Sequence, residues 1–103
     1  MGYYTKYTLI VAPEFYEKVK FDPDLNKVIQ FAYSGGEAER NGTWYDHESD
    51  MKAISLRYPE IIFQLNGVGE EHLDIWRKYF KGGKVQFATV QITYEDFNEE
   101  SLE

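Results

Sequence analysis

Apolar and polar side chains alternate along residues 3–12, and one of the two faces carries Tyr3, Thr5, Tyr7, Leu9 and Val11. A period of two in a segment rich in β-branched and aromatic residues predicts a strand. Pro13 has no backbone N–H to donate, so it ends this strand or places it at a sheet edge. The pattern over residues 14–21 fits either a strand or one helical turn, and both remain open.

The next segment carries the signals of a helix start. Asp22 can cap the helix, Pro23 suits its first position, and Asp24 complements the positive end of the helix dipole. The side chains that would share one helical face are Leu25, Val28, Ile29 and Ala32. Gly35-Gly36 is expected to end this helix.

A second helix is predicted from Asp46, as its cap, to about Arg57, and Pro59 closes the segment. Its buried stripe consists of Met51, Ile54 and Tyr58. Before it, residues 34–42 are expected to form a glycine-rich loop that ends in a turn dipeptide. Residues 43–45 are predicted to be a short extended piece.

Three consecutive strands are predicted in the last part of the chain. Residues 60–66 read as a strand with Ile61, Phe63 and Leu65 on one face. Gly67-Val68-Gly69 is expected to form a turn. Residues 72–80 and 84–94 then form a hairpin, because Gly82-Gly83 can adopt the positive φ values that a tight turn requires.

This order of elements predicts an α+β fold. We expect a two-layer sandwich in which one antiparallel sheet of four or five strands carries two helices on one face and ends in a three-stranded meander. The opposite face of the sheet would be open and lined partly by tyrosine. Residues 1–94 would form a single domain and residues 95–103 an acidic tail, in which Leu102-Glu103 could be native or left by a cloning site.

Composition excludes several classes of protein. The chain has 103 residues and no cysteine, which rules out a disulfide scaffold and any cysteine-based zinc site. It contains no run of 18 apolar residues, and residues 1–12 lack the pattern of a signal peptide. A cytoplasmic protein is therefore expected.

Charge is unevenly distributed along the chain. The net charge is −7, from 11 basic and 18 acidic side chains. Residues 1–45 are nearly balanced, residues 46–75 and 91–103 are each strongly acidic, and residues 76–90 contain basic side chains without an acid. Direct binding of nucleic acid is disfavoured, because such affinity comes mostly from neutralising phosphates. A partner with a basic surface is favoured instead.

A first candidate site is the run from Trp44 to Asp50. It combines two aromatic side chains, a histidine and three carboxylates, namely Trp44, Tyr45, Asp46, His47, Glu48 and Asp50. Such a set could stack a nucleic-acid base and perform acid–base chemistry, and Asp46 with His47 could contribute to a metal site. In the structural alternative, Asp46 caps the helix, Glu48 and Asp50 occupy its first turn, and Trp44 belongs to the core.

A second candidate site follows the predicted turn. If the segment is extended, the side chains that share one face are Glu70, His72, Asp74 and Trp76. Glu70, His72 and Asp74 could bind Zn²⁺ or Mn²⁺ or act as acid and base, with a further ligand from the region of His47. The alternative is an ordinary solvated strand face.

A third candidate is the basic hairpin, where Arg77, Lys78, Lys81 and Lys84 surround Tyr79, Phe80 and Phe87. Interleaved basic and aromatic residues can contact nucleic acid. They can also protect a sheet edge from aggregation, or bind an acidic partner or a second copy of the chain.

Several of these runs together resemble a set of small acidic proteins encoded by phages and bacteria. The runs are Trp44-Tyr45-Asp46-His47-Glu48, Gly69-Glu70-Glu71, Trp76 and Gly83-Lys84. The resemblance covers roughly residues 44–102. The resemblance implies that a phage or a bacterium encodes the chain, and that the protein lies in the host cytoplasm in the case of a phage. It identifies no catalytic residue. It suggests a protein that acts by binding a host protein.

The leading hypothesis is therefore a non-enzymatic protein-binding module without a cofactor. It would inhibit a host defence or nucleic-acid-handling protein that has a basic surface, with no membrane contact. The binding residues would be Trp44, Tyr45, Asp46, Glu48, Asp50, Glu70, Glu71, Asp74 and Trp76. The alternatives are a small metal-dependent or acid–base enzyme or nucleotide binder using His47, Glu70, His72 and Asp74, and a structural protein that forms oligomers. A homodimer is compatible with each.

Overall fold

The computed structural model describes residues 4–31, 37–71, 74–88, 90 and 96–102. Its strands are β1 (Thr5–Ile10), β2 (Gln30–Phe31), β3 (Glu37–Gly42), β4 (Phe63–Gly69), β5 (Ile75–Lys81) and β6 (Lys84–Ala88). Its helices are α1 (Pro13–Val19), α2 (Pro23–Val28) and α3 (His47–Leu56), followed by the short 3₁₀ helix η1 (Glu99–Ser101).

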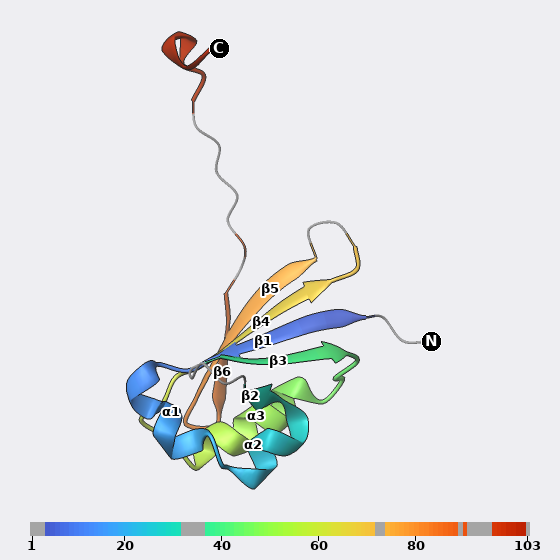
Figure 1. Cartoon of the computed structure of the whole chain (residues 1–103), viewed down its shortest axis with the longest axis vertical. Helices are drawn as coiled ribbons and strands as arrows, with labels where there is room; N and C mark the ends of the chain where they lie inside the picture. Colours follow the sequence, from blue (N-terminus) through green and yellow to red (C-terminus); the bar gives the residue numbers. More distant parts are fainter. Residues whose placement is uncertain (1–3, 32–36, 72–73, 89, 91–95, 103) are drawn as a thin grey trace.

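The strands form one antiparallel sheet in the order β2-β3-β1-β4-β5-β6. Figure 1 shows α1, α2 and α3 together on one side of this sheet. The α+β class is confirmed. The described part of the chain has six strands rather than four or five, and three α-helices rather than two. None of the helices in this part has the length and apolar character needed to cross a lipid bilayer.

The core lies between the sheet and the helices. The fully buried side chains Leu9, Phe63, Leu65 and Phe80 project from the sheet, and Met51, Val19 and Leu25 meet them from the helices. The predicted faces of β1 and β4 are confirmed, because Tyr7, Leu9 and Val11 are buried and so are Ile61, Phe63 and Leu65.

The hairpin of β5 and β6 is also confirmed. Gly82 and Gly83 have φ values of 58° and 80°, which suit the tight turn that joins the two strands. Residues 14–21, left open by the sequence, lie mostly in α1, and Pro13 occupies the first turn of that helix. Of the predicted strand 84–94, residues 89 and 91–94 lie outside the described residues.

The predicted helix of residues 25–32 is shorter than expected. Asp22 caps α2 with its side chain as predicted, but the helix ends at Val28 and Ile29 is extended, with φ −154° and ψ 146°. Ile29 leads directly into β2, which pairs with β3. The spacing of the apolar residues would allow a longer helix, but the pairing of β2 with β3 stabilises an extended backbone here. Ala32, Gly35 and Gly36 lie outside the described residues.

Three other predictions were wrong in detail. The predicted loop of residues 34–42 is largely β3, which pairs with β1 on one side and β2 on the other. Gly67-Val68-Gly69 is the end of β4 rather than a turn. Asp46 occupies the cap position of α3, but its side chain makes no capping hydrogen bond. Residues 43–45 connect β3 to α3 without joining the sheet.

Candidate functional site

Four ring side chains from different parts of the chain pack together between the sheet and α3. We call Tyr7, Trp44, His47 and Trp76 the aromatic cluster. The His47 ring stacks on the Trp76 ring, with centroids 5.0 Å apart and planes at 21°. Tyr7 lies edge-on to both tryptophans, at 5.4 Å from Trp44 and 5.9 Å from Trp76. The cluster therefore fastens the start of α3 to β1 and β5.

A glycine in β4 makes room for this cluster. Gly67 lies directly opposite Trp76 in the strand register. A Cβ atom built on Gly67 would overlap the Trp76 indole. The indole can lie across the sheet toward Tyr7 only because position 67 carries no side chain.

Both ring nitrogens of His47 have partners. Nδ1 lies 3.0 Å from the Trp44 carbonyl oxygen, so it carries the proton and donates to that oxygen. Nε2 then accepts from the Lys78 ammonium at 2.8 Å. Burial lowers the pKa of His47 below its usual value and the nearby Lys78 charge lowers it further, against the opposing effects of the Trp44 carbonyl, Glu48 and Asp50. His47 is neutral in this arrangement.

Lys78 is the charged centre of the site. Its side chain is 13% exposed, its Nζ lies 3.5 Å from Glu48 Oε2, and it lies over the Trp76 ring at 4.9 Å. Because Lys78 is on the helix side of β5, it belongs with Trp76 and Phe80 rather than with the exposed basic residues of the hairpin. The predicted basic group is thus divided between the two faces of the sheet.

Trp44 is buried, as the structural alternative predicted, with 4% of its surface exposed. Its indole Nε1 donates to Asp50 Oδ2 at 2.7 Å. Arg40 lies over the Trp44 ring and donates to the carbonyl oxygens of Val28 and Thr43. Trp44 and Asp50 therefore have internal structural roles.

Other predicted site residues lie in, or just after, the connections that leave one end of the sheet. We call Asp46, Glu48, Glu70, Glu71 and Asp74 the acidic end. Thr5 is opposite both Gly42 and Gly69, so the start of β1, the ends of β3 and β4 and the start of β5 lie side by side (Figure 1). The connections that leave these strand ends carry Asp46, Glu70, Glu71 and Asp74, and Glu48 follows in the first turn of α3. Glu70 Oε1 accepts from the Tyr4 backbone N–H, which ties the β4–β5 connection to the N-terminal part of β1.

Exposure differs among these residues. Tyr45 is 79% exposed beside the acidic end, so it is the aromatic side chain most available to a partner there. Asp46, Glu48, Glu70 and Glu71 are exposed, while Asp74 and Trp76 are partly buried. The aromatic cluster includes Trp44 and His47, which flank Tyr45 and Asp46 in the chain.

The alternative metal site is not assembled within the described residues. Residues 4–31, 37–71, 74–88, 90 and 96–102 contain no group of three or more potential ligands arranged to hold a metal ion. His72, which the predicted set requires, lies outside them. The metal alternative stays a prediction, and elemental analysis of the purified protein is the measurement that tests it.

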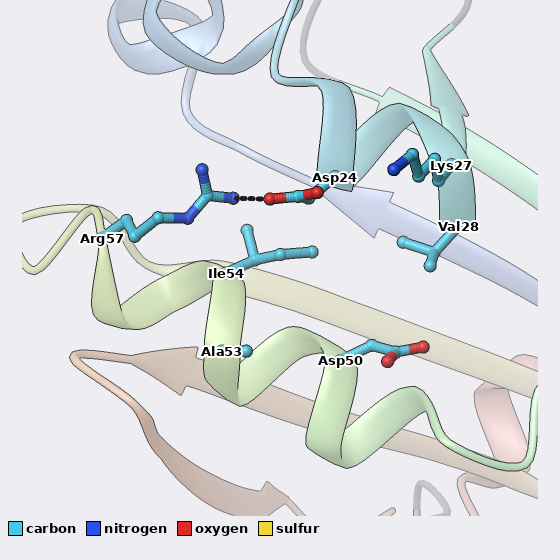
Figure 2. A pocket seen from close by; sticks show the side chains of 7 residues that line it. All are labelled: Asp24, Lys27, Val28, Asp50, Ala53, Ile54 and Arg57. Carbon is cyan, nitrogen blue, oxygen red and sulfur yellow. Dashed lines mark ion pairs between the residues drawn. The ribbon is translucent and has the colours of Figure 1, made fainter.

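A separate hollow of about 300 Å³ lies between α2 and α3 (Figure 2). Arg57 and Asp24 form an ion pair across it, and Asp50 lines its other end. Asp50 also accepts from Trp44, and Arg57 also bonds Asp22. Arg57 thus joins the end of α3 to the start of α2, and the Asp50 carboxylate is held by Trp44.

The pH dependence of the free energy of unfolding should reveal the protonation of His47. The free energy of unfolding is expected to fall as the pH decreases from about 7 to about 5. Because the folded-state pKa of His47 is lowered, the unfolded chain binds the proton more readily and gains stability relative to the folded chain. Urea unfolding at both pH values measures this fall.

The His47→Gln variant should show a smaller fall than the wild type. The matched control is Gln86→Ala, which changes an exposed side chain that does not titrate and should keep the wild-type fall. An equal pH dependence in wild type and His47→Gln would contradict the assignment of His47 as the neutral partner of Lys78.

The sequence interpretation assigned Tyr7, Arg40 and Gly67 to no candidate site, and it grouped Lys78 with the other basic residues of the hairpin. For Lys78 a signal existed, since period-two alternation places it on the same strand face as the buried Phe80. Gly67 is also typical of a turn, and only its pairing with Trp76 explains why a glycine is needed at this position. Comparisons of the chain with protein-family models, with curated proteins and with solved structures find no match.

Proposed function

We propose that this chain is a non-enzymatic protein-binding module that engages a partner with a basic surface through the acidic end. The observation that supports the proposal is that two connections leaving the same end of the sheet, and the helix start that follows one of them, carry exposed carboxylates. These are the β3–α3 connection with Asp46, the start of α3 with Glu48, and the β4–β5 connection with Glu70 and Glu71.

The contacts that hold the start of α3 in place, next to Asp46 and Glu48, favour binding. The aromatic cluster and the Lys78–Glu48 ion pair hold the start of α3 against β5. A preformed surface loses little conformational entropy when a partner binds. Complementary charge accelerates association and sets specificity. Tyr45, 79% exposed, supplies an aromatic contact of the kind enriched in protein interfaces.

An inhibitory role toward a host defence or nucleic-acid-handling protein is part of the same proposal. Such proteins carry basic grooves for phosphates, and a surface of clustered carboxylates competes for that kind of groove. Enzymatic use of His47 is less well supported, because its two ring nitrogens already bond Trp44 and Lys78.

The test begins with a partner captured from host lysate and then purified. We expect the affinity of the purified complex to fall roughly tenfold or more between about 50 mM and about 500 mM NaCl. The variant Asp46→Asn/Glu71→Gln should lower affinity at low salt and have little effect at high salt. Isothermal titration calorimetry measures both.

The matched control is Glu14→Gln/Glu37→Gln, which removes the same charge from exposed positions on α1 and β3. This control should bind like the wild type. A complex that is unaffected by salt, or that is weakened equally by the two double variants, would contradict binding through the acidic end.

A further inference from the structure

A second charged surface lies on the side of the sheet away from the helices. We call the outward residues of β4, β5 and β6 the basic face. Its described members are Gln64, Asn66, Val68, Ile75, Arg77, Tyr79, Lys81, Lys84, Gln86 and Ala88. None of these described residues is acidic, in a chain whose net charge is −7.

The central cation of this face is held by neutral groups. Arg77 Nε donates to Asn66 Oδ1 at 2.9 Å, and its NH1 donates to the Tyr79 hydroxyl at 3.2 Å. Within the described part of the chain, no ion pair joins Arg77, Lys81 or Lys84 to a carboxylate. An oriented guanidinium without a counter-charge is suited to bind a carboxylate or phosphate.

Two apolar hollows accompany these cations. One, of about 420 Å³, is lined by Val68, Ile75 and Val90 beside Arg77. The other, of about 390 Å³, is lined by Ile62 and Val85 beside Tyr79, Lys81 and Lys84. Val68, Ile75 and Ile62 are each about half exposed. The face therefore offers both charge and apolar contact to an acidic segment with apolar side chains.

The C-terminal segment of this chain has that chemistry. Residues 96–102 carry the acids Asp96, Glu99 and Glu100 together with Phe97 and Leu102. Phe97 is 80% and Leu102 65% exposed, and all seven residues are exposed in one copy of the chain. Hydrogen bonds in this segment join its own residues, such as Ser101 N–H to the Asn98 carbonyl and Leu102 N–H to the Glu99 carbonyl.

We propose that the basic face binds residues 96–102 of a second copy of this chain, in a reciprocal dimer. The segment follows β6, which is the edge strand of the sheet. From Val90 the chain can reach about 20 Å to Asp96, at roughly 3.4 Å for each residue. A two-fold axis beside β6 lets each copy place its segment on the face of the other, and the assembly closes at two.

A second copy fits this face better than a nucleic acid does. The net charge of −7 repels a polyanion and a second copy alike, but the segment of the second copy brings the apolar side chains Phe97 and Leu102 beside its three acids. The larger hollow is lined mainly by the aliphatic side chains Val68, Ile75, Ala88 and Val90, while single-stranded nucleic acid binds through stacked aromatic rings. The contact uses different residues from the acidic end, so it stands independently of the proposed function.

Sedimentation velocity of the full chain tests the dimer at about 50 mM NaCl, over about 1 µM to about 500 µM protein. The mass should rise with concentration from 12.2 kDa toward twice that value. Arg77→Ala and Phe97→Ser should each weaken dimerisation roughly tenfold, and the double variant little more than either, because the two side chains belong to one contact. Both residues are exposed, so neither variant should unfold the chain.

The matched control is Lys27→Ala, an exposed cation on α2, which should dimerise like the wild type. Three results would overturn the proposal. The first is a mass of 12.2 kDa at every concentration. It includes the case in which the segment binds the basic face of its own chain, which NMR would show as a shift of the Arg77 signals in the Phe97→Ser variant. A dimer indifferent to Arg77→Ala and Phe97→Ser is the second. The third is a monomer whose basic face binds a single-stranded oligonucleotide.

Discussion

Replacing Asp22 by alanine should lower the free energy of unfolding by about 3 kcal/mol, because a buried carboxylate that several donors share would be lost. Oδ1 of Asp22 accepts from the backbone N–H groups of Asp24 and Leu25, at 2.9 and 3.0 Å. Oδ2 accepts from the Tyr58 hydroxyl at 2.5 Å, and the Arg57 guanidinium lies 3.0 Å away. One side chain thus caps α2 and holds the end of α3.

Urea unfolding of wild type, Asp22→Ala and the control Asp24→Asn measures the effect. The Asp24 carboxylate is 60% exposed and pairs with Arg57 at 3.3 Å, so its loss should cost less than about 1 kcal/mol. Equal destabilisation by the two variants would show that charge near Arg57, rather than the buried network of Asp22, is what matters.

The same network predicts a pH dependence. Burial by itself would raise the pKa of Asp22, but the hydrogen bonds from Tyr58, Leu25 and Arg57 outweigh it, and the pKa lies below the ordinary value of 3.8. The stability that this carboxylate contributes is therefore complete above about pH 5 and is lost as the pH falls through the lowered folded-state pKa. The difference in unfolding free energy between wild type and Asp22→Asn should be constant above about pH 5 and shrink in stronger acid.

Placing alanine at Gly67 should lower the free energy of unfolding by about 3 kcal/mol, the upper part of the range for overpacking. The new Cβ would overlap the Trp76 indole. β4 is paired on both sides, with β1 and β5, so its backbone has little freedom to move away. The indole must move instead, and its stacking on His47 and its contact with Tyr7 would be lost. Denaturant unfolding and tryptophan fluorescence measure the two effects.

A double-mutant cycle separates this overlap from a general intolerance of β4. In a Trp76→Ala background, Gly67→Ala should cost much less, because the atoms that it meets are gone. The neighbouring control Val68→Ala changes a half-exposed side chain and should cost less than about 1 kcal/mol. If Gly67→Ala were equally costly with and without the indole, the explanation by Trp76 would be wrong.

Local chemistry was sufficient for several elements of the fold. The alternation in β1 predicted its buried face, the Gly82-Gly83 pair predicted the hairpin turn, and Asp22 predicted a capped helix. Each of these depends on residues close together in the chain, where periodicity, positive φ and capping act directly. A core position was one of the two alternatives for Trp44, and Trp44 is buried.

The elements that were predicted wrongly depend on partners far away in the chain. The residues of β3 have weak strand propensity, yet β1 and β2 supply hydrogen bonds on both of its sides, and Ile29 is extended because β2 pairs there. Gly67 looked like part of a turn until the register placed Trp76 opposite it. In each case tertiary pairing outweighed a local preference of only about 1 kcal/mol.

The sequence by itself determined which residue types were available: an acidic chain, one basic hairpin, and a histidine among aromatic residues and carboxylates. Only the tertiary structure decided how they are grouped. It divides the hairpin so that Lys78 bonds His47 on the inner side while Arg77 lies on the outer side, and it brings distant connections together at the acidic end. The physical reason is that strand register, which sets both the face and the neighbour of each side chain, is fixed by long-range pairing and by the packing of one buried face.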